Sequence, residues 1–312
     1  MKIFDSKATA DRLPFDKLIP ALRQIFIEGC EVPRRHSHII NERDHASDTL
    51  LIMPAWQKGR YLGIKHVTIY PENSKNGLPG LRSTYTLFDA SNGLPLSIID
   101  GDQITIRRTA GASALAAGYL ARDDASRMVI VGAGNVAAAL ASAYAAVRPI
   151  REVDVWSITA EKAEALAQRL RAAGFAARSV SDLRASVEQA DIVSCATLSR
   201  APLIQREWLR PGTHLDLIGS FQPDMRESDD ATFSDTSVFI DTAEALEKSG
   251  DLLSPIGHGV FHADHVLATL EDLCRGIHAG RSRRDEITVY KAVGNACEDL
   301  AAGVLVHESG ES

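Results

Sequence analysis

The sequence predicts an α/β protein in which a doubly wound parallel sheet follows a separate α+β region. Between residues 128 and 241, short apolar segments alternate with segments of helical periodicity, which is typical of a parallel sheet with helices on its faces. Before residue 100, strand-like segments follow one another without helices between them, which indicates a different arrangement. A chain of 312 residues has room for two domains of ordinary size.

The N-terminal region is predicted to start with an amphipathic helix that Asp16 caps and Gly29 ends. Its apolar residues at helical spacing are Leu18, Leu22, Ile25 and Phe26. Strands are predicted at residues 50–54, 62–70, 84–88 and 94–99, the last two paired around a turn at 89–93. An alanine-rich helix is predicted over residues 107–121.

The central region supplies the parallel sheet. Its predicted strands cover residues 128–131, 153–156, 176–180, 192–196, 215–218 and 238–241, with helices over 135–147, 160–173 and 182–188. The C-terminal stretch 286–306 is predicted to be one helix.

Charge and cysteine usage limit the possible partners. The formal net charge of −7 argues against nucleic acid or an anionic membrane as the main partner. The four cysteines are far apart and show no zinc-ligand spacing, which favours a reduced cytoplasm without a disulfide framework or structural metal. The sequence shows no signal peptide and no apolar run long enough for a membrane span.

A glycine turn directly after the strand at 128–131 is the strongest local motif. Gly132 permits a tight turn, Gly134 lets the backbone approach a pyrophosphate, and Ala137 allows close packing of helix on strand. Asn135 and Val136 begin the helix, whose free N–H groups and dipole favour phosphate. The alternative is a glycine turn in an unliganded sheet, but the strand–turn–helix context predicts a Rossmann dinucleotide-binding domain.

The end of the second strand bears on the choice between NADH and NADPH. A site for NADH usually has an acidic residue there, which binds the ribose 2′-hydroxyl. This strand instead leads into Ser157 and Thr159, with Lys162 nearby, and Asp154 lies inside the strand. We therefore expect NADPH, or use of both cofactors.

Several segments resemble the ornithine cyclodeaminase/mu-crystallin family over nearly the whole chain. The matching segments are Met53-Pro54, residues 63–65, 89–95, 108–110, 131–134, 219–227 and 287–299. The resemblance implies a Rossmann domain of residues 120–288 that is inserted in an α+β substrate-binding domain of residues 1–119 with 289–312. The substrate-binding domain is also expected to form a homodimer.

The resemblance further implies three basic residues that bind a substrate carboxylate. By position these are Lys65, Arg108 and Arg35, with Arg34 as the alternative to Arg35. An arginine offers two parallel hydrogen bonds to a carboxylate, and a lysine adds a compact charge. Arg108 at the start of a predicted helix also opposes the helix dipole, which a bound anion would explain. A solvated surface lysine is the plain alternative for Lys65.

The loop at residues 219–227 discriminates between branches of the family. Cyclodeaminases have a proton-transferring aspartate as its third residue, and this chain has Phe221. The following residues resemble the Pro-Asp-x-Arg-Glu of ketimine and pyrroline-carboxylate reductases, and Lys291 matches a lysine of the reductase type. Asp224 is either a structural loop residue or an aid to proton transfer. Phe221 and Met53 are expected to form walls of an apolar pocket.

The resemblance thus implies an NAD(P)H-dependent reductase of cyclic imino acids, with Lys65, Arg108 and Asp224 as catalytic candidates. The alternatives are an ornithine cyclodeaminase, an alanine-type amino-acid dehydrogenase, or an NADP-holding binding protein of the crystallin kind. Residues assigned to the cofactor, besides those of the glycine turn and of the second strand end, are Thr109, Ala196, Thr197, Leu198 and Gly219. The cluster of His258, His262 and His265 is interpreted as a helix start, and no metal is expected.

Overall fold

The computed structural model describes residues 1–42 and 47–309, apart from the side chain of Ser74. The chain divides into two compact units, which are Met1–Arg108 with Asn295–Ser312, and Thr109–Gly294. The first boundary falls inside helix α3 (Gly101–Leu120) and the second directly before helix α10 (Ala296–Glu308). The expected boundaries lay at the C-terminal end of α3 and inside the C-terminal stretch. Below, the two units are called the N-terminal unit and the Rossmann unit.

The N-terminal unit contains a six-stranded sheet in the order β1-β6-β5-β4-β3-β2. The strands are β1 (Lys2–Phe4), β2 (His36–Asn41), β3 (Asp48–Trp56), β4 (Tyr61–Ile69), β5 (Leu81–Asp89) and β6 (Pro95–Asp100). Neighbours run antiparallel except β1 and β6, which are parallel. The four strands predicted here are confirmed within a few residues. β1 and β2 escaped prediction because β1 is short and all six residues of β2 are exposed.

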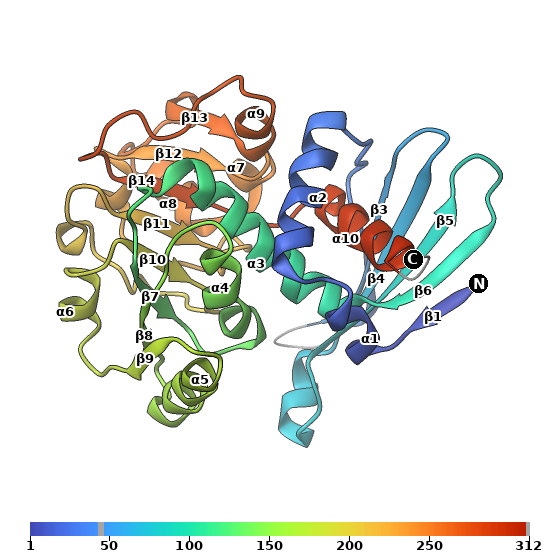
Figure 1. Cartoon of the computed structure of the whole chain (residues 1–312), viewed down its shortest axis with the longest axis horizontal. Helices are drawn as coiled ribbons and strands as arrows, with labels where there is room; N and C mark the ends of the chain where they lie inside the picture. The colour runs from blue at the N-terminus through green and yellow to red at the C-terminus, as the bar shows by residue number, and fades with distance from the viewer. Residues whose placement is uncertain (43–46, 310–312) are drawn as a thin grey trace. The chain divides into compact units, whose positions relative to one another are not determined.

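Helices α1 (Ser6–Asp11), α2 (Phe15–Glu28) and α10 belong to the same unit. Figure 1 shows α2 and α10 next to each other, and α10 packs against strands β3 and β4. The predicted cap of the first long helix is wrong, because α2 begins at Phe15 after Pro14, and Asp16 lies in its first turn. Proline at this position is favourable because its missing N–H would have no helical partner.

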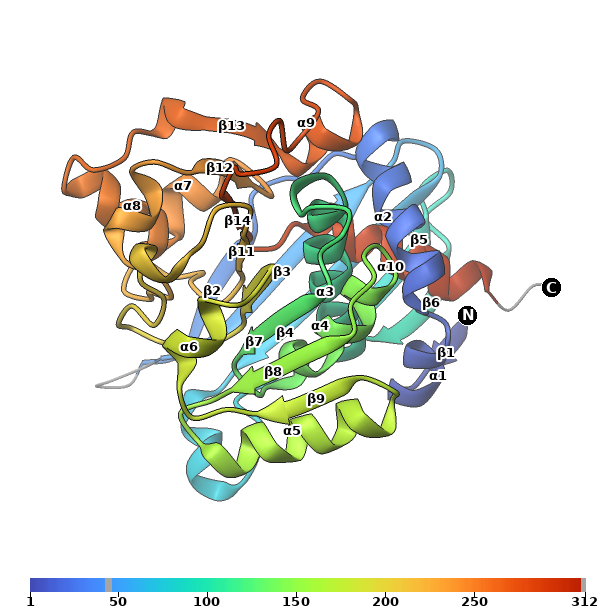
Figure 2. The same ribbon diagram turned by 60° about the vertical axis from the view of Figure 1, so that its left-hand side comes forward.

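The Rossmann unit contains an eight-stranded parallel sheet in the order β13-β12-β14-β11-β10-β7-β8-β9. The strands are β7 (Arg127–Val131), β8 (Glu152–Trp156), β9 (Ala176–Ser179), β10 (Ile192–Cys195), β11 (His214–Leu217), β12 (Ser237–Ile240), β13 (Val266–Thr269) and β14 (Thr288–Lys291). The helices are α4 (Asn135–Ala145), α5 (Ala160–Ala172), α6 (Leu183–Val187), α7 (Ala245–Lys248), α8 (Gly250–Gly257) and α9 (Leu270–Cys274). Figure 2 shows α5 running alongside β8 and β9. The predicted doubly wound fold is confirmed.

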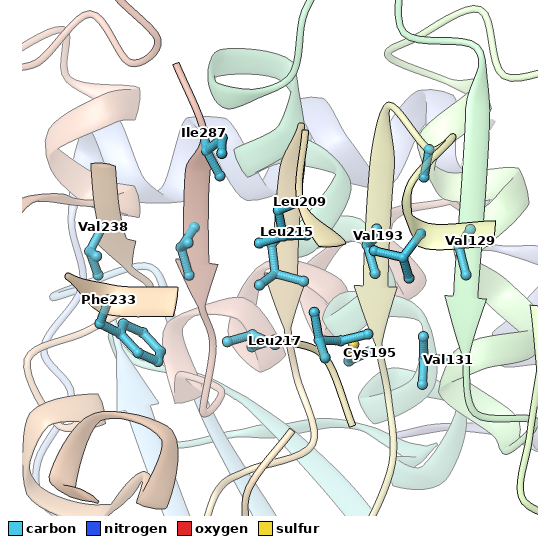
Figure 3. Packing of buried hydrophobic residues seen from close by; sticks show 14 of the residues in the cluster. Val129, Val131, Val193, Cys195, Leu209, Leu215, Leu217, Phe233, Val238 and Ile287 are labelled. Atoms are coloured by element: carbon cyan, nitrogen blue, oxygen red, sulfur yellow. The ribbon is translucent and has the colours of Figure 1, made fainter. Parts of the chain in front are cut away.

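Aliphatic side chains from the middle of this sheet form its hydrophobic core. In Figure 3, Val129 and Val131 of β7, Val193 of β10, and Leu215 and Leu217 of β11 project into one layer. Residues that are apolar along the whole strand are typical of parallel strands buried on both faces. This packing fixes the carboxyl ends of β7, β10 and β11, where the loops of the candidate site begin.

Two predictions about helices are wrong. The stretch 286–306 is not one helix, because Thr288–Lys291 forms the central strand β14 and only Ala296–Glu308 is helical. The strand contains β-branched and aromatic residues, which favour a sheet, and Gly294 takes a φ of 84° between the two elements. The alanine-rich helix begins at Gly101 rather than at residue 107, so Arg108 does not lie at a helix start. The dipole argument for a bound anion there fails.

Candidate active site

The glycine turn in the Rossmann unit links β7 to the N-terminus of α4. Gly132 has a φ of 115°, a value that side chains disfavour, and a Cβ there would lie 2.5 Å from the carbonyl oxygen of Ala196. Gly134 is the N-cap of α4, and a Cβ on it would meet open space. The free N–H groups at the start of α4 can therefore face a phosphate at this turn.

A cavity of about 460 Å³ opens beside this turn. Its lining comes from the ends of β7, β8 and β10 and comprises Gly132, Ala133, Gly134, Trp156, Ser157, Ile158, Thr159, Lys162, Ala196, Thr197, Leu198, Ser199 and Leu203. Eight of the residues assigned to the cofactor from sequence are among them. Thr109, Asn135, Val136 and Gly219 are not among the described residues that line it. Two apolar lining residues, Trp156 and Leu203, were not assigned to the cofactor from sequence. Their side chains provide apolar walls against which a flat ring can pack.

The end of β8 carries neutral and basic groups toward this cavity. Ser157, Thr159 and Lys162 line it, whereas Asp154 accepts two hydrogen bonds from Arg178 of β9, at 2.7 and 3.0 Å. Asp154 is thus held by a guanidinium on the neighbouring strand. A 2′-phosphate in the cavity would meet Lys162 and no carboxylate from the lining residues.

The loop after β11 places Phe221 and Asp224 on the exterior of the Rossmann unit. Phe221 is 42% exposed, and Asp224 forms an ion pair of 2.7 Å with the exposed Arg200. Lys291, by contrast, is fully buried on β14, where its ammonium donates to the carbonyl oxygen of Leu217 at 2.9 Å. Asp224 is therefore an exposed loop residue paired with a neighbouring arginine, whereas Lys291 lies in the interior of the sheet.

The N-terminal unit buries two of the predicted carboxylate-binding residues together. Lys65 of β4 is 2% exposed, and Arg108 of α3 is 6% exposed. The Lys65 ammonium lies 2.6 Å from one oxygen of Asp299, and Arg108 Nε lies 2.9 Å from the other. Arg108 also donates to Glu298 at 2.7 Å. The structure thus brings Lys65 and Arg108 together on one carboxylate.

Glu298 and Asp299 occupy the first turn of α10, which Asn295 caps through its side chain. Acidic groups are favoured at this end of a helix by the dipole. Sequence reasoning did not assign them a role, although the family resemblance ended at Asp299. An asparagine cap followed by two carboxylates was the available clue.

Burial lowers the pKa of Lys65 to about 8, with Asp299 opposing the shift and Arg108 adding to it. The ammonium is therefore close to losing its proton at mildly alkaline pH. Cations held in a dry interior interact far more strongly with an anion than they would in water. Such a cluster can hold a carboxylate in a fixed orientation.

A row of buried side chains crosses the sheet at Lys65. Met53 of β3 pairs with Lys65, and Lys65 pairs with Tyr85 of β5, so the three share one face. The Tyr85 hydroxyl occupies the space that a side chain would need at Gly63, and the Tyr85 ring occupies that space at Gly303. Burial raises the pKa of Tyr85 well above the usual range. The row gives Lys65 rigid neighbours on both sides.

The arginines before β2 lie at the edge of the same sheet. His36, the first residue of β2, pairs with Ile52, and Arg35 directly before it is half-buried. Arg34 is exposed. The lower exposure of Arg35 favours it over Arg34 as the third basic residue of the predicted substrate site.

The three histidines do not begin an α-helix, contrary to the prediction from sequence. His258 follows the C-terminal end of α8, and His262 directly precedes a short 3-10 segment, Ala263–His265. His258 pairs with Asp230 at 2.6 Å, and the rings of His262 and His265 meet edge to face. Over residues 1–42 and 47–309, no group of three or more potential ligands is arranged to hold a metal ion. In the same part of the chain, no helix has the length and apolar character needed to cross a bilayer.

The parallel sheet, the glycine turn and the adjacent cavity define a protein of the Rossmann dinucleotide-binding class. A family model described as the ornithine cyclodeaminase/mu-crystallin family matches residues 12–312. The chain therefore belongs to this family, as the sequence predicted.

Three relatives show how closely it matches. The Delta(1)-pyrroline-2-carboxylate reductase of Paracoccus denitrificans is 43% identical over 254 residues, which cover 81% of this chain and 80% of the relative. The corresponding enzyme of Thermococcus litoralis, solved with NADH and L-proline, is 32% identical with a TM-score of 0.93, covering 100% of this chain and 98% of that one. An archaeal alanine dehydrogenase dimer with bound NAD is 26% identical with a TM-score of 0.91, covering 100% and 96%.

Proposed function

We propose that this chain is an NAD(P)H-dependent reductase of cyclic imino acids. It converts Δ1-pyrroline-2-carboxylate or Δ1-piperideine-2-carboxylate to L-proline or L-pipecolate. The observation that carries the proposal is the burial of Lys65 and Arg108 on Asp299, because a protein that binds only apolar ligands has no need of two buried cations. The similarity to two enzymes named Delta(1)-pyrroline-2-carboxylate reductase supports it.

The N-terminal unit recognises the substrate. Lys65 and Arg108 bind its carboxylate, Arg35 adds a third cation, and Met53 gives an apolar wall against the ring. Glu298 and Asp299 orient Lys65 and Arg108 before the substrate arrives, which avoids reorganisation during the reaction.

The Rossmann unit binds the dinucleotide in the cavity beside Gly132 and Gly134, through α4 and the lining residues. When bound, the dihydronicotinamide supplies a hydride to the imine carbon. The C=N bond becomes a C–N bond, and the ring nitrogen, protonated before or during the transfer, becomes the amine of the product. A 2′-phosphate is bound by three side chains that donate hydrogen bonds to it, those of Ser157, Thr159 and Lys162. NADPH is therefore used at least as well as NADH.

An alanine-type dehydrogenase is the nearest alternative, because it needs the same cations and the same hydride transfer, and a dehydrogenase of this kind has a similar fold. Ornithine cyclodeaminase activity is disfavoured by Phe221, which offers no proton-transferring group. A crystallin-like binding protein would keep the cavity but would gain nothing from the buried cations.

We also propose that the chain forms a homodimer in the cytoplasm. The related alanine dehydrogenase is a dimer, and in this chain the edge strand β2 exposes Ile39 and Ile40. An exposed edge with apolar side chains favours pairing with another chain. The four free cysteines fit a reducing compartment. Light scattering on the purified protein would give the mass of the assembly.

The decisive experiment follows the absorbance of the dihydronicotinamide with each candidate substrate in turn. We expect oxidation of NADPH and NADH by the five- or six-membered cyclic imine, at a rate far above that with pyruvate plus ammonia. A faster reaction with pyruvate and ammonia would favour the dehydrogenase instead. Release of ammonia from L-ornithine without any reduction of the imines would overturn the proposal.

A further inference from the structure

Glu227 joins the ends of two neighbouring strands in the Rossmann unit through one buried carboxylate. Its Oε1 accepts hydrogen bonds from the backbone N–H of Thr197 at 2.7 Å and from the Thr197 hydroxyl at 2.8 Å. Its Oε2 accepts from the N–H of Gly219 at 2.7 Å. Thr197 follows β10 and Gly219 follows β11, which are parallel neighbours. A single side chain therefore sets the spacing of the two loops.

The close fit of this carboxylate explains the glycine at position 219. A Cβ there would lie 2.0 Å from the carbonyl oxygen of Thr197 and 2.4 Å from Glu227 Oε1. Neither distance is compatible with a side chain. The carboxylate of Glu227 thus occupies space that Gly219 leaves open.

Thr197 connects this carboxylate to the dinucleotide cavity. It lines the cavity, and a Cβ placed on Gly132 would lie 3.3 Å from its Cγ2. Thr197 is thus a near neighbour of the glycine turn at which the pyrophosphate is expected. A shift of Thr197 would change both the wall of the cavity and the space around Gly132.

We propose that Glu227, in its ionised form, is a positioning residue for the dinucleotide, which it holds in place through Thr197 without touching it. The proposal rests on the proposed cofactor function. Glu227 is fully buried and is not among the described residues that line the cavity, so its action is indirect. An ionised carboxylate can accept all three hydrogen bonds, whereas a protonated one turns one oxygen into a donor.

The surroundings of Glu227 bring the protonation of its carboxylate close to neutral pH. Burial raises its pKa to about 7, with Lys291 of β14 opposing the shift and Asp251 of α8 adding to it. The thiol of Cys195 on β10 is a further titratable neighbour. Lys291 lies 3.8 Å from Asp251, which Arg226 approaches to 3.6 Å. Above this pKa Glu227 is ionised and holds both loops, and below it the hold weakens.

The first test measures the dissociation constant of NADH for the whole wild-type protein between about pH 6 and pH 8.5. NADH is chosen because it lacks the 2′-phosphate of NADPH, whose second pKa of about 6 would confuse the profile. We expect affinity to rise several-fold with pH through the region of the Glu227 pKa. Binding near that pH should also release protons, seen as a heat that depends on the buffer.

The second test uses two variants that move the profile in different ways. In Glu227→Gln an amide NH2 replaces one of the two acceptor oxygens and faces a backbone N–H, for example that of Gly219, as a second donor. We expect about tenfold weaker NADH binding with no pH dependence. In Thr197→Val the ionised carboxylate loses the hydroxyl donor, so the midpoint of the pH profile should move upward. This second variant keeps the test valid if the first fails to fold.

Asp216→Asn is the matched control. Asp216 is equally buried and accepts three hydrogen bonds, from Ser113, Tyr144 and Ser194, and burial raises its pKa to about 6. Its substitution should lower stability yet leave the affinity for NADH and its pH profile as in the wild type. If Glu227→Gln bound NADH as tightly as the wild type, or if the wild-type affinity for NADH did not change with pH, the role of Glu227 would be wrong while the proposed function would stand. Absence of NADH binding by the wild type would overturn the proposed function as well.

Discussion

Asp299 holds Lys65 at 2.6 Å in an interior where the two side chains are 0% and 3% exposed. The same carboxylate also faces Arg108 Nε at 2.9 Å, so one acidic group orients both cations assigned to the substrate. Taking charges out of water is costly unless each has a partner, and this cluster pairs two cations with two carboxylates. The binding of an anionic substrate therefore depends on residues that need not touch it.

Asp299→Asn should reduce kcat/KM for the cyclic imine by about 100-fold, mainly through a higher KM. The asparagine keeps the shape but removes the charge that orients Lys65 and Arg108. The free energy of unfolding should also fall by about 3–5 kcal/mol, because two buried cations lose a partner. Steady-state kinetics and denaturant titration measure the two effects, with kinetics taken where the variant is still folded.

Asp11→Asn is a suitable control for this substitution. Asp11 pairs with Lys7 at 2.5 Å, but both side chains are exposed in helix α1. Exposed pairs contribute little to stability, so this variant should keep wild-type kinetics and nearly wild-type stability. If Asp299→Asn behaved like the control, the role assigned to the buried cluster would be wrong.

The pH profile of kcat/KM should fall as pH rises through about 8. Burial lowers the pKa of Lys65 to about 8, so the free enzyme loses this cation above that pH and binds the substrate carboxylate less well. The imine substrate also loses a proton in alkaline solution, which could produce the same profile. In Lys65→Arg the cation persists at all accessible pH values, so the alkaline fall should disappear. A fall that persists unchanged in the variant would belong to the substrate.

Most of the Rossmann unit could be predicted because its local patterns are strong. Strands β7, β10 and β11 are buried on both faces, whereas β8 buries Val153 and Val155 on one face only. The positive φ of Gly132 in the turn after β7 is a conformation that favours glycine. β14 was missed although its β-branched and aromatic residues favour a sheet, because it has only four residues and helix α10 follows closely. Its pairing with β11 and β12 determines that it is a strand. Such long-range pairing leaves little trace in a local pattern.

The residues of the candidate site that could be predicted from sequence are those that lie in motifs shared with the family. Lys65 and Arg108 were identified by resemblance, but their acidic partner Asp299 lies 234 and 191 positions further along the chain and gave no periodic pattern. Glu227 was part of a quoted motif, yet its bonds to Thr197 and Gly219 depend on the spacing of two strands. Contacts of this kind follow from tertiary packing and not from sequence patterns.

Ser157→Asp should change the choice between cofactors. A carboxylate at this position would repel the 2′-phosphate of NADPH while offering the ribose hydroxyls of NADH an acceptor. We expect the dissociation constant of NADPH to rise at least about tenfold and that of NADH to stay the same or fall. Ser157→Asn, which has the same size without the charge, controls for shape. If the wild type already bound NADH at least about tenfold more tightly than NADPH, the premise of this prediction would fail.

Arg108→Lys separates an enzyme from a binding protein. A lysine keeps the positive charge but cannot place two nitrogens against Glu298 and Asp299 as the guanidinium does, at 2.7 and 2.9 Å. Without that fork the orientation of the cation is lost, so kcat/KM for the imine should fall by about 100-fold. The affinity for NADH should remain within about twofold, because the described residues that line the cavity all belong to the Rossmann unit. Loss of nucleotide binding together with turnover would show that Arg108 supports the fold instead, and unchanged turnover would remove it from the proposed carboxylate site.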